Sequence, residues 1–202
     1  MSFGLHSRPN AVTQAIKEAT IKKGKLVFAA ASNSGGNSPR AYPASLTGVI
    51  CVHATDGQGN QSRFNPSKEE GGDNFATLGV AIESRWDGKT VLKSGTSFAT
   101  PIAAGIAANV LDFGRHHLTD DDDQIKYKRL CSYSGMRLMF KCMSSRRGDY
   151  DYVSPWKVFS SLSGDLKTED YIQKICENMR SVLNTDTIPT EWAHGLAGAG
   201  FE

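Results

Sequence analysis

The chain has 202 residues, enough for one domain of ordinary size, with or without an appendage. Hydrophobic residues make up 39% of it and charged residues 22%, which excludes a disordered chain, and a net charge of +2 is too small to predict a nucleic-acid partner. No apolar run approaches the ~20 residues of a membrane span, and the first residues lack the pattern of a signal peptide. We therefore expect a globular protein without a nucleic-acid or membrane partner.

Helices and buried strands alternate in the first part of the sequence. Apolar residues at spacings of three and four predict a first helix, which Asn10 caps and which ends in a left-handed turn at Gly24. Short apolar runs bounded by turn signals predict strands buried on both faces. In chain order the predicted elements are a helix over residues 10–23, strands over 26–31, 48–54 and 74–78, and an alanine-rich buried helix over 96–115. This alternation is typical of an α/β fold in which helices flank a parallel sheet.

The character of the sequence changes near the acidic run at residues 120–123, which we interpret as a solvated linker rather than a cation site. Residues 124–145 and 168–183 are amphipathic and predict helices. We therefore divide the chain into residues 1–115 and a mostly helical C-terminal extension over residues 116–202. The extension is either a separate interaction module or a set of helices packed on the first part, and its amphipathicity favours packing.

The four cysteines are too sparse for a disulfide scaffold, and none forms the C-x-x-C pair of a zinc site. We interpret them as reduced and mostly buried, which favours an intracellular location. The sequence predicts no metal site.

The strongest chemical signal is the heptad GTSFATP at residues 95–101. It places Ser97 at the N-terminus of the alanine-rich helix, where free N–H groups and the helix dipole favour developing negative charge. Gly95 allows a substrate backbone to approach closely. A lone serine at a helix start is more often a simple N-cap, so the heptad as a whole has to carry the chemical interpretation.

This heptad resembles the nucleophile motif of the subtilisin family of serine proteases, and a second motif supports the resemblance. The sequence AAASN at residues 29–33 is similar to the strand end that presents the family's oxyanion-hole asparagine, here Asn33. An asparagine N–H₂ and a serine backbone N–H can both donate to a tetrahedral oxyanion. The resemblance implies part of a subtilisin-like sheet, with Ser97 as nucleophile and Asn33 as oxyanion donor.

A third motif, Ser2-Phe3-Gly4, resembles the Ser-x-Gly segment that pairs with substrate backbone in the family. The resemblance implies a substrate-binding surface made by this segment together with Ala31, Ser32, Gly95 and Thr96. Tyr42-Pro43 resembles a family loop whose proline peptide is cis. Calcium is common in the family, but the sequence offers no clear site for it, and no other cofactor is implied.

The family's catalytic Asp and His lie N-terminal to the Ser-x-Gly segment, with which this sequence begins. We therefore expect a fragment of a serine endopeptidase that acts on polypeptides through an acyl-enzyme on Ser97 and needs the missing N-terminal half as its partner. His53, in a predicted strand, is not expected to substitute, and His116 and His117 lie far along the helix from Ser97. The alternative is a catalytically inactive pseudoprotease module that binds extended peptides.

Overall fold

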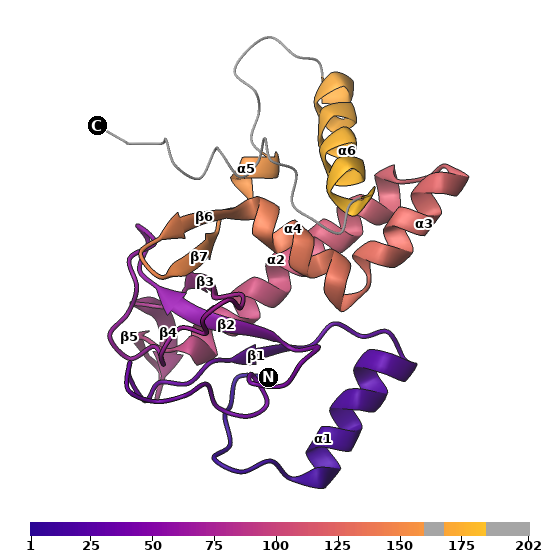
Figure 1. The fold of residues 1–202 in the computed structure, drawn as a ribbon. Coiled ribbons are helices and arrows are strands. Elements are labelled where there is room, and N and C mark those ends of the chain that lie inside the picture. Colours follow the sequence, from indigo (N-terminus) through magenta and orange to yellow (C-terminus); the bar gives the residue numbers. More distant parts are fainter. Residues whose placement is uncertain (160–167, 185–202) are drawn as a thin grey trace.

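The computed structural model describes residues 1–159 and 168–184, and its centre is a five-stranded sheet (Figure 1). The strands are β1 (Phe28–Ala30), β2 (Ile50–Thr55), β3 (Phe75–Leu78), β6 (Ser144–Arg147) and β7 (Tyr150–Val153), in the order β1-β2-β3-β7-β6. Only the pairing of β6 with β7 is antiparallel. The fold is therefore α/β with a mostly parallel sheet flanked by helices, as the sequence predicts.

Helix α1 (Asn10–Lys17) continues as a π-helical turn, η1 (Glu18–Lys22), and packs on one face of the sheet. Gly24 follows with a φ of +57°, which confirms the predicted left-handed turn. The prediction that Asn10 caps the helix is wrong. Pro9 holds the capping position in an extended conformation, and Asn10 is the first helical residue.

Helix α2 (Thr96–His117) covers the opposite face of the sheet. Its alanines Ala99, Ala103 and Ala107 are buried against the core side chains of β2, because small residues let the helix backbone approach the strands closely. Pro101 lies in the second turn of this helix without ending it. Gly79, which follows β3, lies close to Ala54 of β2, and its carbonyl accepts a hydrogen bond from Gly95 N just before the helix begins.

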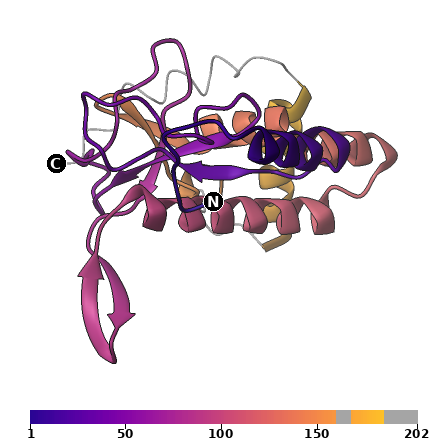
Figure 2. The ribbon, with the colours of Figure 1, turned by 90° about the horizontal axis from the view of Figure 1, so that it is seen from below.

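A two-stranded hairpin of β4 (Ile82–Trp86) and β5 (Lys89–Lys93) projects from the body of the molecule (Figure 2). Sequence reasoning missed it, because most of its residues are exposed on both faces and show no alternation of apolar and polar side chains. The hairpin joins the end of β3 to the start of α2.

The C-terminal part contributes α3 (Asp121–Leu130), α4 (Tyr133–Met143), α5 (Trp156–Phe159) and α6 (Thr168–Asn184). Leu130, Met139 and Met179 belong to the same hydrophobic core as the residues of β2 and α2. Since β7 also pairs with β3, one sheet and one core run across the boundary predicted between residues 115 and 116. The acidic run is not a linker, because three of its residues form the first turn of α3, and buried Asp123 accepts two hydrogen bonds from Arg180.

Candidate active site

Ser97 is the second residue of α2, so its backbone N–H has no acceptor within the helix. Its hydroxyl is partly exposed, and Oγ donates to the carbonyl oxygen of Ser2 at 3.0 Å. A Cβ added to the neighbouring Gly95 would lie 3.1 Å from Asn33 Nδ2, tighter than most Cβ contacts, so Asn33 would have to shift. Glycine therefore lets the helix start lie directly against Asn33.

The carboxamide of Asn33 is oriented by Thr96. Asn33 Oδ1 accepts from Thr96 N at 2.9 Å and from Thr96 Oγ1 at 3.1 Å. Thr96 Oγ1 also lies 3.2 Å from the carbonyl oxygen of Ser32, which it can use as an alternative acceptor. Because Oδ1 is engaged, Nδ2 carries the two unused donors, and within residues 1–159 and 168–184 it has no protein acceptor. The arrangement leaves N–H groups of Asn33 and Ser97 free at the same helix end.

The first five residues form a wall beside this helix end. Met1 O accepts from Ala30 N at 3.1 Å, and Leu5 exchanges two backbone hydrogen bonds with Tyr42. Between them, Gly4 approaches Ala41 so closely that an added Cβ would lie 2.5 Å from the Ala41 Cβ. The Tyr42-Pro43 peptide is cis, as the resemblance implies.

A hollow of about 790 Å³ extends from Ser97 along this wall. Of the predicted substrate-binding residues, Phe3, Gly4, Ser32 and Thr96 line it, as does Asn33. Ser2 reaches Ser97 through its carbonyl group. The side chain of Ala31 is buried, and its backbone is paired on both sides: N donates to Val52 O, and O accepts from Ala41 N. Sequence reasoning missed residues that close the far end of the hollow, namely Ser38, Arg40, Ala41, Ser67, Lys68 and Glu69. They lie in polar loops whose approach to Ser97 no local pattern reveals.

Histidines do not complete a catalytic pair with Ser97 in the described part of the chain. His53 is fully buried on β2, where Nδ1 lies 3.1 Å from the carbonyl oxygen of Phe75. His116 and His117 lie in the last turn of α2, and exposed His6 lines the hollow without a hydrogen bond to Ser97. His194 falls outside the described residues.

Calcium, which the family resemblance raises, needs six to eight oxygen ligands that include carboxylates. No group of three or more His, Cys, Asp or Glu side chains that could hold a metal ion occurs among the residues the structure describes. In the same part of the chain, no helix is long and apolar enough to cross a membrane.

Residues 1–131 match the model of the subtilase family. The M-protease of Shouchella clausii (strain KSM-K16) is 39% identical over 111 residues, which are 54% of this chain and 28% of the relative. Subtilisin Savinase of Lederbergia lenta is also 39% identical over 111 residues, 54% of this chain and 40% of its own length. Subtilisin-like protease 2 of Pseudogymnoascus destructans is 34% identical over 123 residues, 56% of this chain and 29% of the relative.

Among solved structures, the prenylagaramide maturation protease PagA superimposes with a TM-score of 0.56 at 25% identity. The match covers 87% of this chain and 60% of that protease. The chain spans less than half the length of the curated relatives named above.

Proposed function

The chain belongs to the subtilase family, and on this premise we propose that it is the nucleophile-bearing part of a serine endopeptidase. Ser97 Oγ attacks the scissile carbonyl of a polypeptide and forms an acyl-enzyme. The backbone N–H of Ser97 and Nδ2 of Asn33 stabilise the oxyanion of the tetrahedral intermediate. The wall of Ser2, Phe3 and Gly4 binds the substrate backbone in an extended conformation.

The observation that carries this proposal is the orientation of Asn33. In a turn, an asparagine carboxamide can hold the loop through its oxygen, its N–H₂ group or both. Here Thr96 takes the oxygen, and the N–H₂ group is left beside the free N–H of Ser97. Two unpaired donors at a helix N-terminus, next to a serine hydroxyl, are the arrangement that acyl transfer requires.

Within residues 1–159 and 168–184, no side chain lies in position to act as the general base for Ser97. Ser97 Oγ donates to a backbone carbonyl, and a carbonyl cannot carry the proton through the reaction. We propose that a catalytic Asp and His come from a further polypeptide segment. In subtilisin, loss of the His or the Ser alone costs about 2 × 10⁶ in turnover, so we expect the 202 residues alone to be nearly inert.

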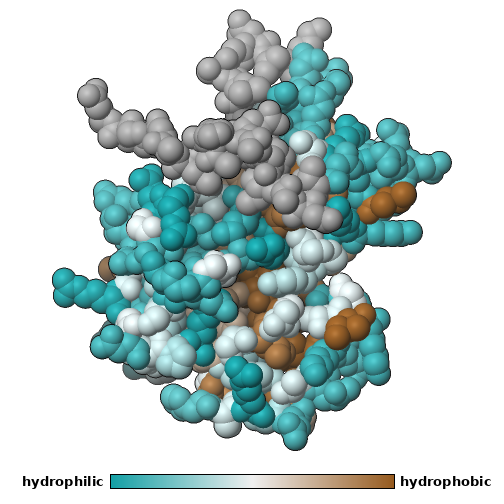
Figure 3. All heavy atoms as spheres, in the orientation of Figure 1, coloured by the Kyte–Doolittle hydropathy of each residue, from teal (hydrophilic) through white to brown (hydrophobic). Residues whose placement is uncertain are grey.

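An apolar groove supports the proposal that further polypeptide packs here. It lies between α1, β1 and the first turns of α2, with a volume of about 760 Å³. Figure 3 shows hydrophobic side chains exposed in the hollow beside α1. Met1 pairs with the outer edge of β1, donating from its N-terminus to Phe28 O at 2.5 Å and accepting from Ala30 N at 3.1 Å, and further polypeptide can continue this pairing. The groove lining is Met1, Ser2, Ala11, Val12, Ala15, Ile16, Ala19, Leu26, Val27, Phe28, Thr100, Pro101 and Ala104.

The test is to sequence the transcript upstream of the Met1 codon. The whole reading frame that contains this codon is then expressed as a protein. We expect a segment with an Asp at a strand end and a His at a helix start. We also expect that the product cleaves a quenched fluorescent protein substrate and reacts covalently with a serine-directed phosphonate. Ser97→Ala removes both activities, whereas Ser94→Ala, at an exposed position three residues upstream, retains them.

A reading frame without such an Asp and His contradicts the endopeptidase. The second candidate then gains support, namely a pseudoprotease that binds extended peptides along Ser2 to Gly4. It predicts peptide binding by fluorescence anisotropy that Ser97→Ala leaves unchanged, without covalent labelling by the phosphonate. The free donors of Asn33 favour the first candidate, because they lie at the same helix end as the Ser97 hydroxyl, where an oxyanion would form.

A further inference from the structure

The loop of residues 69–74, which leads into β3, gathers many oxygen atoms. Asp73 and Asp151 present carboxylates there, and both are largely buried, with side-chain exposures of 13% and 11%. Backbone carbonyls of Glu69, Gly72 and Asp73 point into the same region. Such a collection of carboxylate and carbonyl oxygens is what a hard cation requires.

Side-chain cations, however, already satisfy the two carboxylates. Arg137 of α4 contacts Asp73 through Nε and also through Nη2, at 3.2 Å. Lys141, one turn further along α4, lies 3.1 Å from Asp73 and 2.6 Å from Asp151, and so bridges the two acids. Arg146 is a further cation, 3.5 Å from Asp151. The ammonium of Lys141 also lies over the ring of Phe75, 5.5 Å from its centroid.

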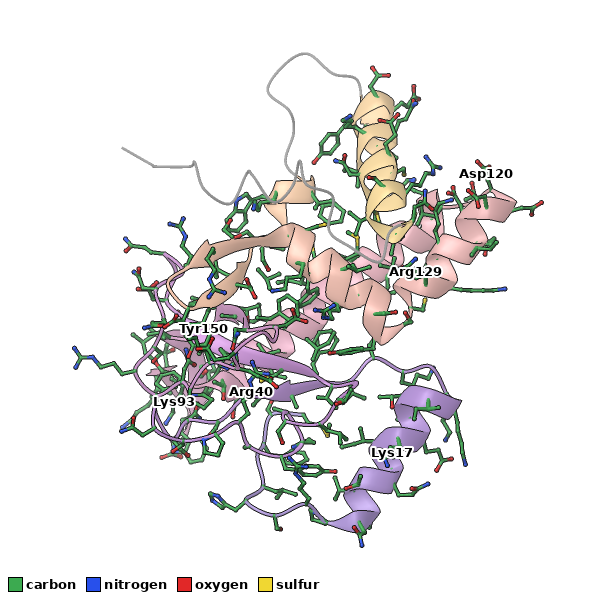
Figure 4. All side chains as sticks on the ribbon, in the orientation of Figure 1. Lys17, Arg40, Lys93, Asp120, Arg129 and Tyr150 are labelled. Carbon is green, nitrogen blue, oxygen red and sulfur yellow. The ribbon has the colours of Figure 1, made fainter. Side chains whose placement is uncertain are left out.

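N–H donors engage the backbone carbonyls of Glu69, Gly72 and Asp73. Arg40, whose side chain is only 10% exposed, donates from Nη2 to the Asp73 carbonyl at 2.6 Å and to Asn74 Oδ1 at 2.8 Å. Asn74 in turn donates from Nδ2 to the carbonyls of Glu69 and Gly72. Figure 4 shows Arg40 beside the strands of the sheet, whereas Lys17 lies on α1. These oxygens are therefore not available as metal ligands without breaking existing hydrogen bonds.

We propose that the guanidinium and ammonium groups of Arg40, Arg137 and Lys141, together called the cation clamp, hold this loop in place and occupy the oxygens that a calcium ion would need there. The cation clamp connects three parts of the molecule. Arg40 comes from the loop that lines the hollow beside Ser97, Asp73 precedes β3, and Arg137 and Lys141 come from α4, where Lys141 also reaches Asp151 of β7. Folding of this region is therefore independent of calcium. This inference does not depend on catalysis by Ser97.

The test compares the EDTA-treated product of the whole reading frame with its Arg137→Met variant, by isothermal titration with calcium and by thermal melting. We expect Arg137→Met to melt lower by roughly 5 °C or more, because Asp73 loses its main partner while remaining buried. Addition of 5 mM calcium should leave the melting temperature of the unchanged protein within about 1 °C of its value in EDTA.

Lys174→Met is the matched control, because Lys174 forms a single ion pair with Glu177 at 3.5 Å and both side chains are about half exposed. It removes one cation from a helix surface and should shift the melting temperature by less than about 2 °C. Equal losses in the two variants overturn the cation clamp. Calcium binding by the unchanged protein that Asp73→Asn abolishes overturns it as well, whereas calcium binding that survives Asp73→Asn belongs to another site and leaves the cation clamp supported by the Arg137→Met result.

Discussion

Two asparagines, Asn33 and Asn74, lie beside strands β1 and β3 of the same sheet, with β2 between these strands, and they use their carboxamides in opposite ways. Asn74 is buried, and both ends of its side chain are engaged: Oδ1 accepts from Arg40 and from Glu69 N, and Nδ2 donates twice. Asn33 is exposed, and only its oxygen is engaged. Complete pairing holds a loop in place, while a donor held in place without an acceptor is available for chemistry. The same residue type therefore serves stability in one loop and, in our proposal, catalysis in the other.

Between the two asparagines, we expect the larger effect of a substitution on activity at Asn33, the one with free donors. Asn33→Leu removes the free Nδ2 donors and should lower kcat by about 10²–10³, with little change in KM. That size is the one known for the loss of the corresponding asparagine donor in subtilisin, a relative. The measurement is steady-state hydrolysis by the product of the whole reading frame. An unchanged kcat would show that the oxyanion is stabilised elsewhere.

The same substitution at the other asparagine should act on stability. Asn74→Leu leaves the carbonyl of Gly72 and the N–H of Glu69 without their partner, and it removes one acceptor of buried Arg40. At about 1–3 kcal/mol for each unsatisfied group that stays buried, we expect a loss of roughly 3 kcal/mol in the free energy of unfolding. Urea unfolding of both variants tests the contrast. If Asn33→Leu is the more destabilising of the two, the comparison fails.

The sequence predicted the parallel sheet, the two long helices that cover it and the residues at the start of α2, because each depends on a local pattern. The apolar run at residues 48–54 and the alanine spacing of α2 reflect directly which residues are buried. The heptad around Ser97 and the strand end at Asn33 could be identified for the same reason, because each is a short continuous motif.

What the sequence could not predict depends on partners far apart in the chain. Arg40 meets Asp73 and Asn74 across more than 30 residues, and Arg137 meets Asp73 across 64. The strand β7 pairs with β3 although a long helical stretch separates them. Polar and charged residues in such positions carry no periodic signal, so the prediction of a mostly helical extension over residues 116–202 misses that β6 and β7 belong to the sheet.

His53 tests a third case, a buried polar group that is only half paired. Its Nδ1 faces the carbonyl of Phe75, so the neutral ring carries its proton there, and Nε2 has no partner among the described residues. Burial, assisted by the charge of Arg40, lowers the pKa of His53 from 6.5 to about 3. Protonation would place a new N–H donor, and a charge, where neither is satisfied.

The sign of the pH effect follows from this depressed pKa. Between about pH 3 and 6.5 the unfolded chain binds a proton at His53 that the folded chain does not, so stability is full above pH 6.5 and falls as the pH falls. At pH 5 the expected loss is about 2 kcal/mol relative to pH 7. His53→Leu should remove this part of the pH dependence, whereas His116→Leu, on an exposed ring, should retain it. Urea unfolding at pH 7 and pH 5 measures both. A loss at pH 5 that is the same in His53→Leu as in the unchanged protein would mean that the ring is protonated inside the fold. His53 would then be protonated in the folded chain despite its burial, and it would not contribute to the pH dependence of stability.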